Sequence, residues 1–415
     1  MMSDLLLPPG TRLLHIGPHK TGTTALQIAL GKNREAMLSQ GVHYVWGGEH
    51  LNANLAALAV AKRPTRRFAS AKPVPIEHWT SLVEKVNAAS ASERVVISGE
   101  EFCSAQEGVI EQIVSDLGRE KLQILITLRP LEKIMASQWQ QFVQAGVVTT
   151  SIDEWLRSAF DSEVEIESIR RFWVRHRHDQ MVHRWVERVG REHVTILVLD
   201  ESDKSYLYRK VEELVGVSAG TLITDERLIN RSMTLQEAES VRAMYSLLKE
   251  QGLGELADHV RFMISPSEVI KRKRVPHPSE SRITLPGWAI REARDVGRGM
   301  VDAIRDEGVR IIGDLNWLAP EQQSKDSAAA SGSGPSADTL HVPVDLAGWT
   351  AYGAILSSGI ARGDLPPAPT STLPFSWLRR ATGSQLMREV FRRANIRIRQ
   401  PFQKLIGGRD HKKDE

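Results

Sequence analysis

Residues 13–27 read LLHIGPHKTGTTALQ, a short apolar run followed by a loop of glycine, lysine and threonine and then by a helical pattern. Backbone N–H groups at the start of a helix point toward an anion, and the helix dipole favours negative charge there. Gly22 permits close approach of the backbone to such an anion, and Lys20 adds a full positive charge. The stretch therefore predicts a strand, a phosphate-binding loop and a helix in succession.

The spacing within this loop indicates which anion it binds. A nucleoside-triphosphate loop reads G-x-x-x-x-G-K-[ST], with its lysine after the second glycine. In this chain Lys20 comes before Gly22, and the order HKTGTT resembles the 5′-phosphosulfate loop of the sulfotransferase family, commonly P-K-[ST]-G-T-[TS]. The usual proline is replaced by a histidine. The resemblance implies that 3′-phosphoadenosine 5′-phosphosulfate (PAPS) is the sulfuryl donor, held by His19, Lys20, Thr21, Gly22, Thr23 and Thr24.

Further apolar runs bounded by turn residues predict the remaining strands. Each is short and nearly continuous in apolar residues, as strands buried on both faces of a parallel sheet are. The predicted strands are Arg12 to Ile16, Glu93 to Ser98, Gln123 to Leu128, His193 to Leu199 and Val309 to Ile312. Helical patterns lie between them, including Tyr206 to Val215 and a helix capped by Thr234 and Glu237. The alternation predicts an α/β fold of the P-loop nucleotide-binding type, a parallel sheet flanked by helices on both faces.

A second phosphate site is indicated after the predicted strand Gln123 to Leu128. Arg129 follows that strand directly, and ligands of open α/β sheets bind outside the carboxyl ends of the strands. Its planar guanidinium can clamp a phosphate at two points, and Ser137, eight residues later, can donate one more hydrogen bond. This pair is similar to the 3′-phosphate element of the sulfotransferase family. Alone it is a weak signal, but it follows the 19–24 loop in the expected order.

Sulfuryl transfer needs a base that removes the proton of the acceptor. Glu100 emerges where the run RVVISG ends, and in sulfotransferases the equivalent strand ends in a catalytic histidine or glutamate. Glu101 is expected to point elsewhere. The second candidate is His50, with Glu49 under the same argument, because glycan-type members carry a catalytic glutamate soon after the first helix. The alternatives are a capping role for Glu100 and a substrate contact for His50.

Two other segments could contact phosphate, although surface exposure is the favoured explanation for both. They are Asn230 to Ser232 and the basic run Lys271 to Arg274, which lacks the glycine that follows the family's late basic element. The acceptor is predicted only as a small molecule, glycan or glycolipid, since its specificity would come from loops such as 46–62 and 142–164.

The composition is that of a globular protein, with 41% hydrophobic and 25% charged residues in 415. Residues 1–320 are predicted as the α/β domain, 321–339 as a flexible Ser/Ala/Gly-rich linker and 340–415 as an extension with a basic amphipathic helix. From Ser371 to Glu415 there are eleven Lys/Arg against four Asp/Glu, a net charge of +7 within an overall +3. This tail is predicted either to contact anionic membrane or to stay solvated or packed on protein.

Several classes of protein are disfavoured. One cysteine, Cys103, cannot form an internal disulfide, and the N-terminus lacks the basic region of a secretory signal. We expect a cytoplasmic enzyme without a transmembrane anchor, metal ion or nucleic-acid partner. A P-loop kinase is the competing enzyme class, and a nucleotide-binding adaptor at the membrane surface is the competing binding protein.

Overall fold

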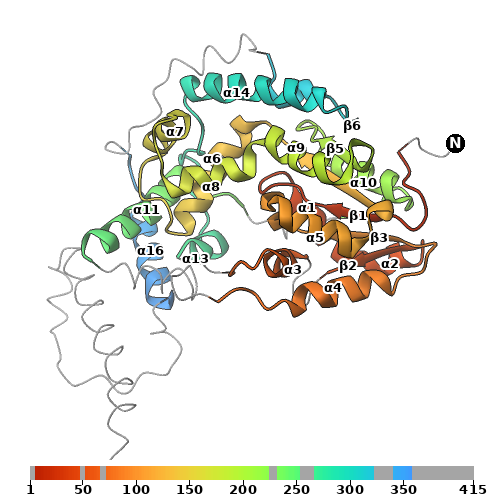
Figure 1. Ribbon diagram of the computed structural model, residues 1–415. Coiled ribbons are helices and arrows are strands. Elements are labelled where there is room, and N and C mark those ends of the chain that lie inside the picture. Colours follow the sequence, from red (N-terminus) through yellow and green to blue (C-terminus); the bar gives the residue numbers. More distant parts are fainter. Residues whose placement is uncertain are drawn as a thin grey trace, which may run out of the picture.

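The computed structural model describes residues 5–46, 52–65, 72–223, 231–252, 266–321 and 340–357. Among them is a six-stranded sheet in which every pair of neighbours is parallel, with the order β2-β3-β1-β4-β5-β6 (Figure 1). The strands are β1 (Arg12–His15), β2 (Val42–Val45), β3 (Arg94–Ser98), β4 (Leu122–Leu128), β5 (Val194–Val198) and β6 (Arg310–Ile312). The predicted α/β fold is confirmed. Only the four-residue edge strand β2 was not among the predicted strands.

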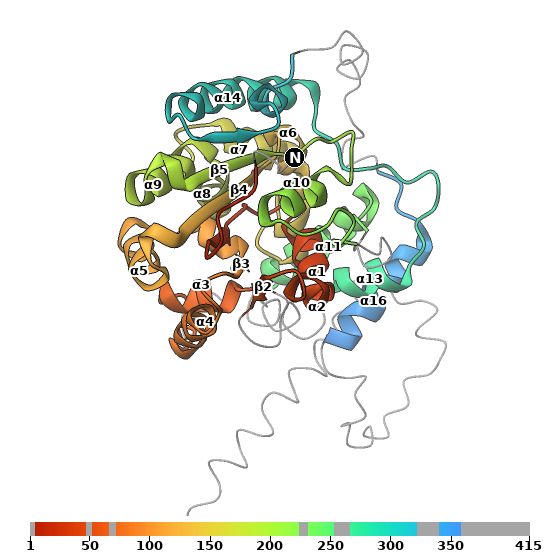
Figure 2. The ribbon, with the colours of Figure 1, turned by 90° about the vertical axis from the view of Figure 1, so that its right-hand side faces the viewer.

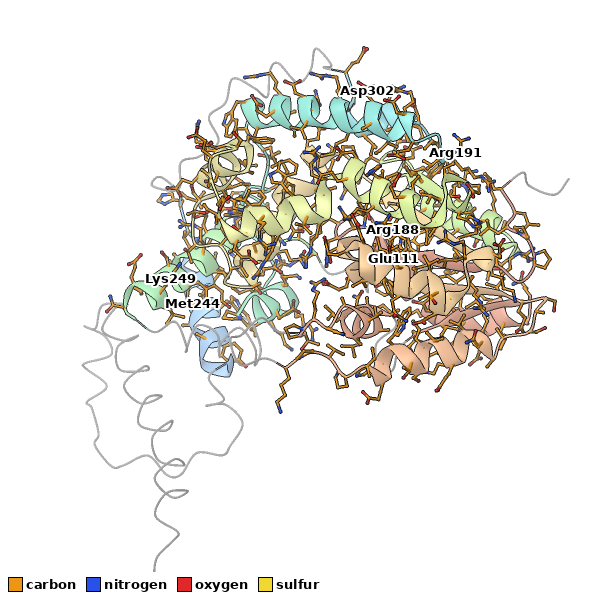
Figure 3. All side chains as sticks on the ribbon, viewed as in Figure 1. Glu111, Arg188, Arg191, Met244, Lys249 and Asp302 are labelled. Atoms are coloured by element: carbon orange, nitrogen blue, oxygen red, sulfur yellow. The ribbon has the colours of Figure 1, made fainter. Side chains whose placement is uncertain are left out.

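Helices cover both faces of the sheet because successive side chains of a strand point to opposite faces. Leu13 of β1 packs with helices α1 (Thr23–Lys32), α2 (Arg34–Leu38) and α10 (Tyr206–Val215). Its neighbour Leu14 packs with helices on the other face, α3 (Asn54–Val60), α4 (Glu77–Asn87), α5 (Glu107–Leu117) and α9 (His178–Val189). Figure 2 shows these two layers on either side of the strands. In Figure 3, Arg188 and Glu111 lie side by side, and their ion pair joins α9 to α5 at 3.1 Å.

A second group of helices packs around its own apolar core beside the sheet (Figure 1). Fully buried aromatic side chains, Trp139, Trp155 and Phe172, form the centre of this core. The helices are α6 (Leu131–Gln144), α7 (Ile152–Phe160), α8 (Glu167–His176), α11 (Leu235–Glu250), α13 (Pro266–Lys273), α14 (Gly287–Asp306) and α16 (Val344–Ser357). Short 3-10 turns complete the described elements, η1 (Glu100–Ser104), η2 (Arg119–Lys121), η3 (Arg191–His193) and η5 (Leu315–Leu318).

Two predicted helix ends are confirmed by their backbone geometry. Thr234 accepts a hydrogen bond from the Glu237 N–H, and the Glu237 carboxylate accepts one from the Thr234 N–H, so a capping box begins α11. Helix α10 ends at Gly216, whose φ of 74° is the left-handed conformation that glycine adopts without strain.

Helix α16 packs against α13 and α11, although it follows the predicted linker in the sequence. Leu346 is fully buried in the second core, and the carboxylate of Asp345 lies 2.9 Å from Nε of Arg274. The predicted domain boundaries stay a prediction, since most of the linker and the predicted basic amphipathic helix lie outside the described residues.

Candidate active site

The candidate site lies at the carboxyl edge of the sheet, where four adjacent strands end. Strands β3, β1, β4 and β5 are neighbours in that order, and each is followed at this edge by a polar segment. Glu100 follows β3, the 19–24 loop follows β1, Arg129 follows β4 and Glu201 follows β5. Sequence analysis did not identify Glu201; its signal was the run VLDES, an acidic segment after a predicted strand.

A chain of buried hydrogen bonds connects strands β3, β1 and β4 to Thr21 of the 19–24 loop. His15 Nδ1 lies 2.8 Å from Ser98 Oγ, and His15 Nε2 lies 3.1 Å from Thr127 Oγ1, so the ring joins β1 to both neighbouring strands. Thr127 Oγ1 also lies 2.9 Å from Thr21 Oγ1, and the Thr21 hydroxyl donates to the carbonyl of Pro18. Burial lowers the pKa of His15 to about 4, so its ring is neutral at pH 7.

The proton positions in this chain follow from counting donors. Since Thr21 uses its one proton on Pro18, the Thr127 hydroxyl donates to Thr21, and Thr127 Oγ1 must then accept from His15 Nε2–H. This assigns the proton of the neutral ring to Nε2 and leaves Nδ1 to accept from Ser98. Sequence analysis missed these supporting residues because they lie inside the predicted strands.

Two glycines are required by close contacts around the loop. A Cβ on Gly17 would lie 2.0 Å from Thr127 Oγ1, so no side chain fits above the hydrogen-bonded chain. Gly22 has a φ of 79°, and a Cβ there would lie 2.9 Å from Leu207 Cδ2. The first hydrogen bond of α1 runs from Leu26 N to Gly22 O, so the preceding N–H groups of residues 23–25 have no acceptor within the helix. These N–H groups lie where the sequence analysis predicts an anion-binding loop.

The three threonines of the loop differ in what they offer. The Thr21 hydroxyl is buried and already donates to Pro18, so Thr21 can offer an anion only its backbone N–H. Thr23 is buried as well, whereas Thr24 is exposed at the first turn of α1. Of the three hydroxyls, that of Thr24 is the most accessible to a bound anion.

Lys20 lies among other charges in a poorly solvated position. Burial first, and then the positive charges of Lys271 and Arg129, lower the pKa of Lys20 to about 8, while Glu100 opposes them. Three cations and one carboxylate from distant parts of the chain are therefore close in space. Lys271 belongs to α13, its side chain is largely buried, and its Nζ lies 3.5 Å from Glu268 Oε1, so this residue of the predicted basic run is shielded from bulk solvent and acts on Lys20 by its charge.

Arg129 is held by an acidic partner. Its Nε lies 2.5 Å from Glu201 Oε1 and its Nη2 lies 2.7 Å from Glu201 Oε2, a two-point ion pair. Its remaining Nη1 lies 3.5 Å from the carbonyl oxygen of Lys20, which places the guanidinium beside the loop. Ser137 is half-buried in the second turn of α6.

Glu100 is oriented by a side chain of α1. Gln27 Nε2 donates to Glu100 Oε2 at 2.8 Å, and Asn52 Nδ2 donates to Gln27 Oε1 at 3.3 Å. The carboxylate of Glu100 also acts on Lys20, and, after burial, it contributes to the raised pKa of Tyr44. Glu100 thus lies beside the 19–24 loop, within the electrostatic reach of Lys20.

Glu101 has a different set of partners. Its carboxylate lies 3.0 Å from Arg63 Nη2, 3.4 Å from Arg175 Nη2 and 3.5 Å from His19 Nε2. Burial raises the pKa of Glu101, but the contacts with His19, Arg175 and Arg63 outweigh it and hold that pKa well below its ordinary range. Glu101 therefore lies against the start of the loop, at His19.

His176, at the end of α8, lies behind the loop. It is fully buried, and burial together with the charges of His178, His19 and Lys20 holds its pKa well below the ordinary value. Its Nε2 lies 3.4 Å from Gln138 Oε1, a weak contact. This neutral ring packs against Phe172.

The other predicted candidates fall elsewhere. His50, Glu49 and Asn230 lie outside the described residues. Arg274 is buried in an ion-pair cluster with Glu237 and Glu280, and Arg231 also pairs with Glu237. The structure thus divides the predicted basic run into Lys271, whose charge acts on Lys20, and Arg274, whose guanidinium is fully engaged.

Two kinds of feature are absent from the described ranges. No group of three or more His, Cys, Asp or Glu residues there could hold a metal ion. None of the helices there is both long enough and apolar enough to cross a bilayer.

No protein-family model matches the chain, and no curated protein matches it either. Among solved structures, the chain is similar to a sulfotransferase from Alicyclobacillus acidocaldarius, with 17% sequence identity and a TM-score of 0.36. The match covers 60% of this chain and 96% of that chain. A similarity this low shows nothing about the chemistry of the site, so a function can be inferred only from the residues of this chain.

Proposed function

We propose that this protein transfers a sulfuryl group from PAPS to a hydroxyl or amine of a glycan, glycolipid or small metabolite. The observation that carries the proposal is the convergence of the 19–24 loop, Arg129 and Glu100 at adjacent strand ends. A loop for one phosphate group, an arginine for a second and a carboxylate for the acceptor meet the needs of this reaction. The 19–24 loop and Arg129 are far apart in the sequence, but they come close in space because they follow the neighbouring strands β1 and β4.

The residues have distinct roles in the proposed reaction. The N–H groups at the start of α1 and the Thr24 hydroxyl bind the 5′-phosphosulfate, and Arg129 binds the 3′-phosphate with help from Ser137. Glu100 accepts the acceptor's proton as a new bond forms between the acceptor atom and sulfur. The bond from sulfur to the bridging oxygen breaks, and Lys20 stabilises the charge that develops on that oxygen. The products are the sulfated acceptor and 3′-phosphoadenosine 5′-phosphate.

The polar groups at the 19–24 loop indicate whether the proposed sulfuryl donor fits there. The N–H groups of residues 23–25 precede the first hydrogen bond of α1, and Lys20 is held in a poorly solvated position beside other cations. An anion placed between them would compensate both. This favours a phosphate or phosphosulfate group at the loop, as the resemblance to sulfotransferases implies.

Titration calorimetry tests the class of nucleotide. We expect 3′-phosphoadenosine 5′-phosphate to bind at least tenfold more tightly than adenosine 5′-phosphate, because one charge-assisted two-point contact is worth about 1.5–3 kcal/mol. Arg129→Ala should remove most of that preference. Equal affinity for the two nucleotides in the unaltered chain would overturn the assignment. A preference for ATP with a strict requirement for Mg²⁺ would instead favour phosphoryl transfer.

A further inference from the structure

The guanidinium of Arg129 is already occupied by a carboxylate. Glu201 contacts Arg129 at two points, through Nε at 2.5 Å and Nη2 at 2.7 Å. A phosphate monoester bound at two points through this Nε–Nη2 edge would displace Glu201, because the planar fork matches both anions, and Nη1 on the other edge lies 3.5 Å from the Lys20 carbonyl oxygen. The two anions therefore compete for one binding edge.

The surroundings hold Glu201 in place for this contact. Leu199 N donates to Leu128 O, so the segment after β5 starts beside the segment that carries Arg129. Asp200 then accepts hydrogen bonds from the N–H and hydroxyl of Ser202, a turn that fixes the backbone on both sides of Glu201. The position of Glu201 thus follows from the sheet and a local turn, and not from a chance encounter of two long side chains.

We infer that Glu201 is an internal competitor of the nucleotide 3′-phosphate, displaced from Arg129 when the nucleotide binds and returning when the spent nucleotide leaves. The inference rests on the proposed function. Without Glu201, departure of the phosphate would leave Arg129 without an anionic partner, which favours the bound state. When Glu201 is present, its carboxylate takes the place of the departing phosphate on the guanidinium. Binding and release of the nucleotide then each break one ion pair and form another. Glu201 thereby weakens product binding and speeds release of the spent nucleotide.

The same pair contributes to the choice of nucleotide. A nucleotide that lacks a 3′-phosphate has nothing that displaces Glu201, so its affinity is independent of the pair. A nucleotide with a 3′-phosphate has to break the Arg129–Glu201 contact, so the free energy of that contact is subtracted from its free energy of binding. The effect is modest in size, since the two side chains are 29% and 38% exposed and such ion pairs are partly screened by water.

The test is calorimetry on the full-length chain with Glu201→Gln. The affinity for 3′-phosphoadenosine 5′-phosphate should rise about three- to tenfold, whereas the affinity for adenosine 5′-phosphate should stay within about twofold. The rate constant for dissociation of the bisphosphate, followed by stopped flow, should fall by a similar factor. Asp203→Asn is the matched control, because Asp203 is in the same loop but pairs with Arg209. It removes the same charge and should leave both affinities unchanged.

A double-mutant cycle tests whether Glu201 affects nucleotide affinity through Arg129. In an Arg129→Ala background, Glu201→Gln should change the affinity for the bisphosphate by less than about twofold, since the competed group is gone. Unchanged or weaker binding by Glu201→Gln, with the 3′-phosphate preference still dependent on Arg129, would overturn the inference and leave the proposed function standing. An equal gain from Asp203→Asn would also overturn it, in favour of a general field effect. Absence of any 3′-phosphate preference in the unaltered chain overturns the function and the inference together.

Discussion

Lys20 destabilises the folded, nucleotide-free protein in two ways that an ordinary surface lysine does not. Its φ of 72° is a left-handed conformation that residues other than glycine rarely adopt. Its ammonium group is also poorly solvated and lies near Lys271 and Arg129, so its pKa is lowered to about 8. Backbone strain and desolvated charge of this kind persist at functional sites, where ligand binding compensates them.

Replacing Lys20 by methionine should therefore stabilise the nucleotide-free protein while abolishing sulfuryl transfer. Lys20→Met should raise the free energy of unfolding at pH 7 by about 1–3 kcal/mol, because the pKa of Lys20 is lowered from 10.5 to about 8 at about 1.36 kcal/mol for each tenfold change in the acid constant, discounted for relaxation. Because the folded-state pKa lies below the unfolded value of about 10.5, the cost is fully present below pH 8 and disappears as the pH rises to 10.5.

Urea unfolding at pH 7 and pH 10 measures this difference. The gain from Lys20→Met should be smaller at pH 10, and Lys32→Met, at an exposed position in the last turn of α1, should change stability by less than about 0.5 kcal/mol. Destabilisation by Lys20→Met would show that the lysine serves the fold rather than a ligand.

Glu100 is the described candidate for the base, and its isosteric variant separates catalysis from binding. Glu100→Gln keeps an oxygen that can accept from Gln27 but removes the basic carboxylate, so turnover should fall about 10²- to 10⁴-fold with nucleotide affinity unchanged. Steady-state kinetics and calorimetry on the same preparation provide the comparison. A similar loss in His50→Ala, with Glu100→Gln nearly as active as the unaltered chain, would reassign the base.

At the scale of elements, helix α13 links the active-site edge to the second core. The charge of Lys271 acts on Lys20, while Arg274, less than one turn later, is buried among Glu237, Glu280 and Asp345. These carboxylates come from α11, the segment after α13, and α16, so one guanidinium joins three parts of the chain. Burial alone would raise the pKa of Glu280, but hydrogen bonds from Arg274 and Thr234 outweigh it and lower that pKa to about 2.

Removing this guanidinium should cost far more than removing an exposed one on the same helix. Arg274→Met leaves buried carboxylates without their cation, so we expect a loss of about 3–5 kcal/mol in the free energy of unfolding. Arg272→Met is the matched control, since that side chain is 71% exposed and its loss should cost less than about 0.5 kcal/mol. Chemical denaturation of both variants decides this. Equal effects would mean that the buried cluster contributes no more than a surface pair.

At the scale of the whole molecule, the strongly basic C-terminal segment lies outside the described residues, and its contact with membranes stays a prediction. Its net charge of +7 from Ser371 to Glu415, mixed with large apolar side chains, predicts binding to anionic bilayers, at about 1 kcal/mol for each Lys or Arg near the surface. The full chain should sediment with anionic vesicles and not with neutral ones. A chain that ends at Ser357 should lose this binding while keeping α16 on α13 and α11. Binding that is unaffected by the truncation would exclude this role for the tail.

The sequence by itself determined those features whose residues are consecutive. The 19–24 loop is one contiguous stretch between a strand and a helix, and Arg129 and Glu100 each follow directly on an apolar run, so local spacing placed all three at strand ends. Sequence analysis did not identify the edge strand β2 (Val42–Val45).

Only the tertiary structure decided which strand ends are neighbours. The pairing of β5 with β4 brings Glu201 onto Arg129, and the packing of α13 brings Lys271 to Lys20 across some 250 positions of the chain. His15 likewise joins Ser98 and Thr127 only because β1 lies between β3 and β4. Local periodicity reports which face of an element is buried, but the order of strands and the partner of a charged side chain depend on packing between distant segments. Those contacts are selected by the fold as a whole.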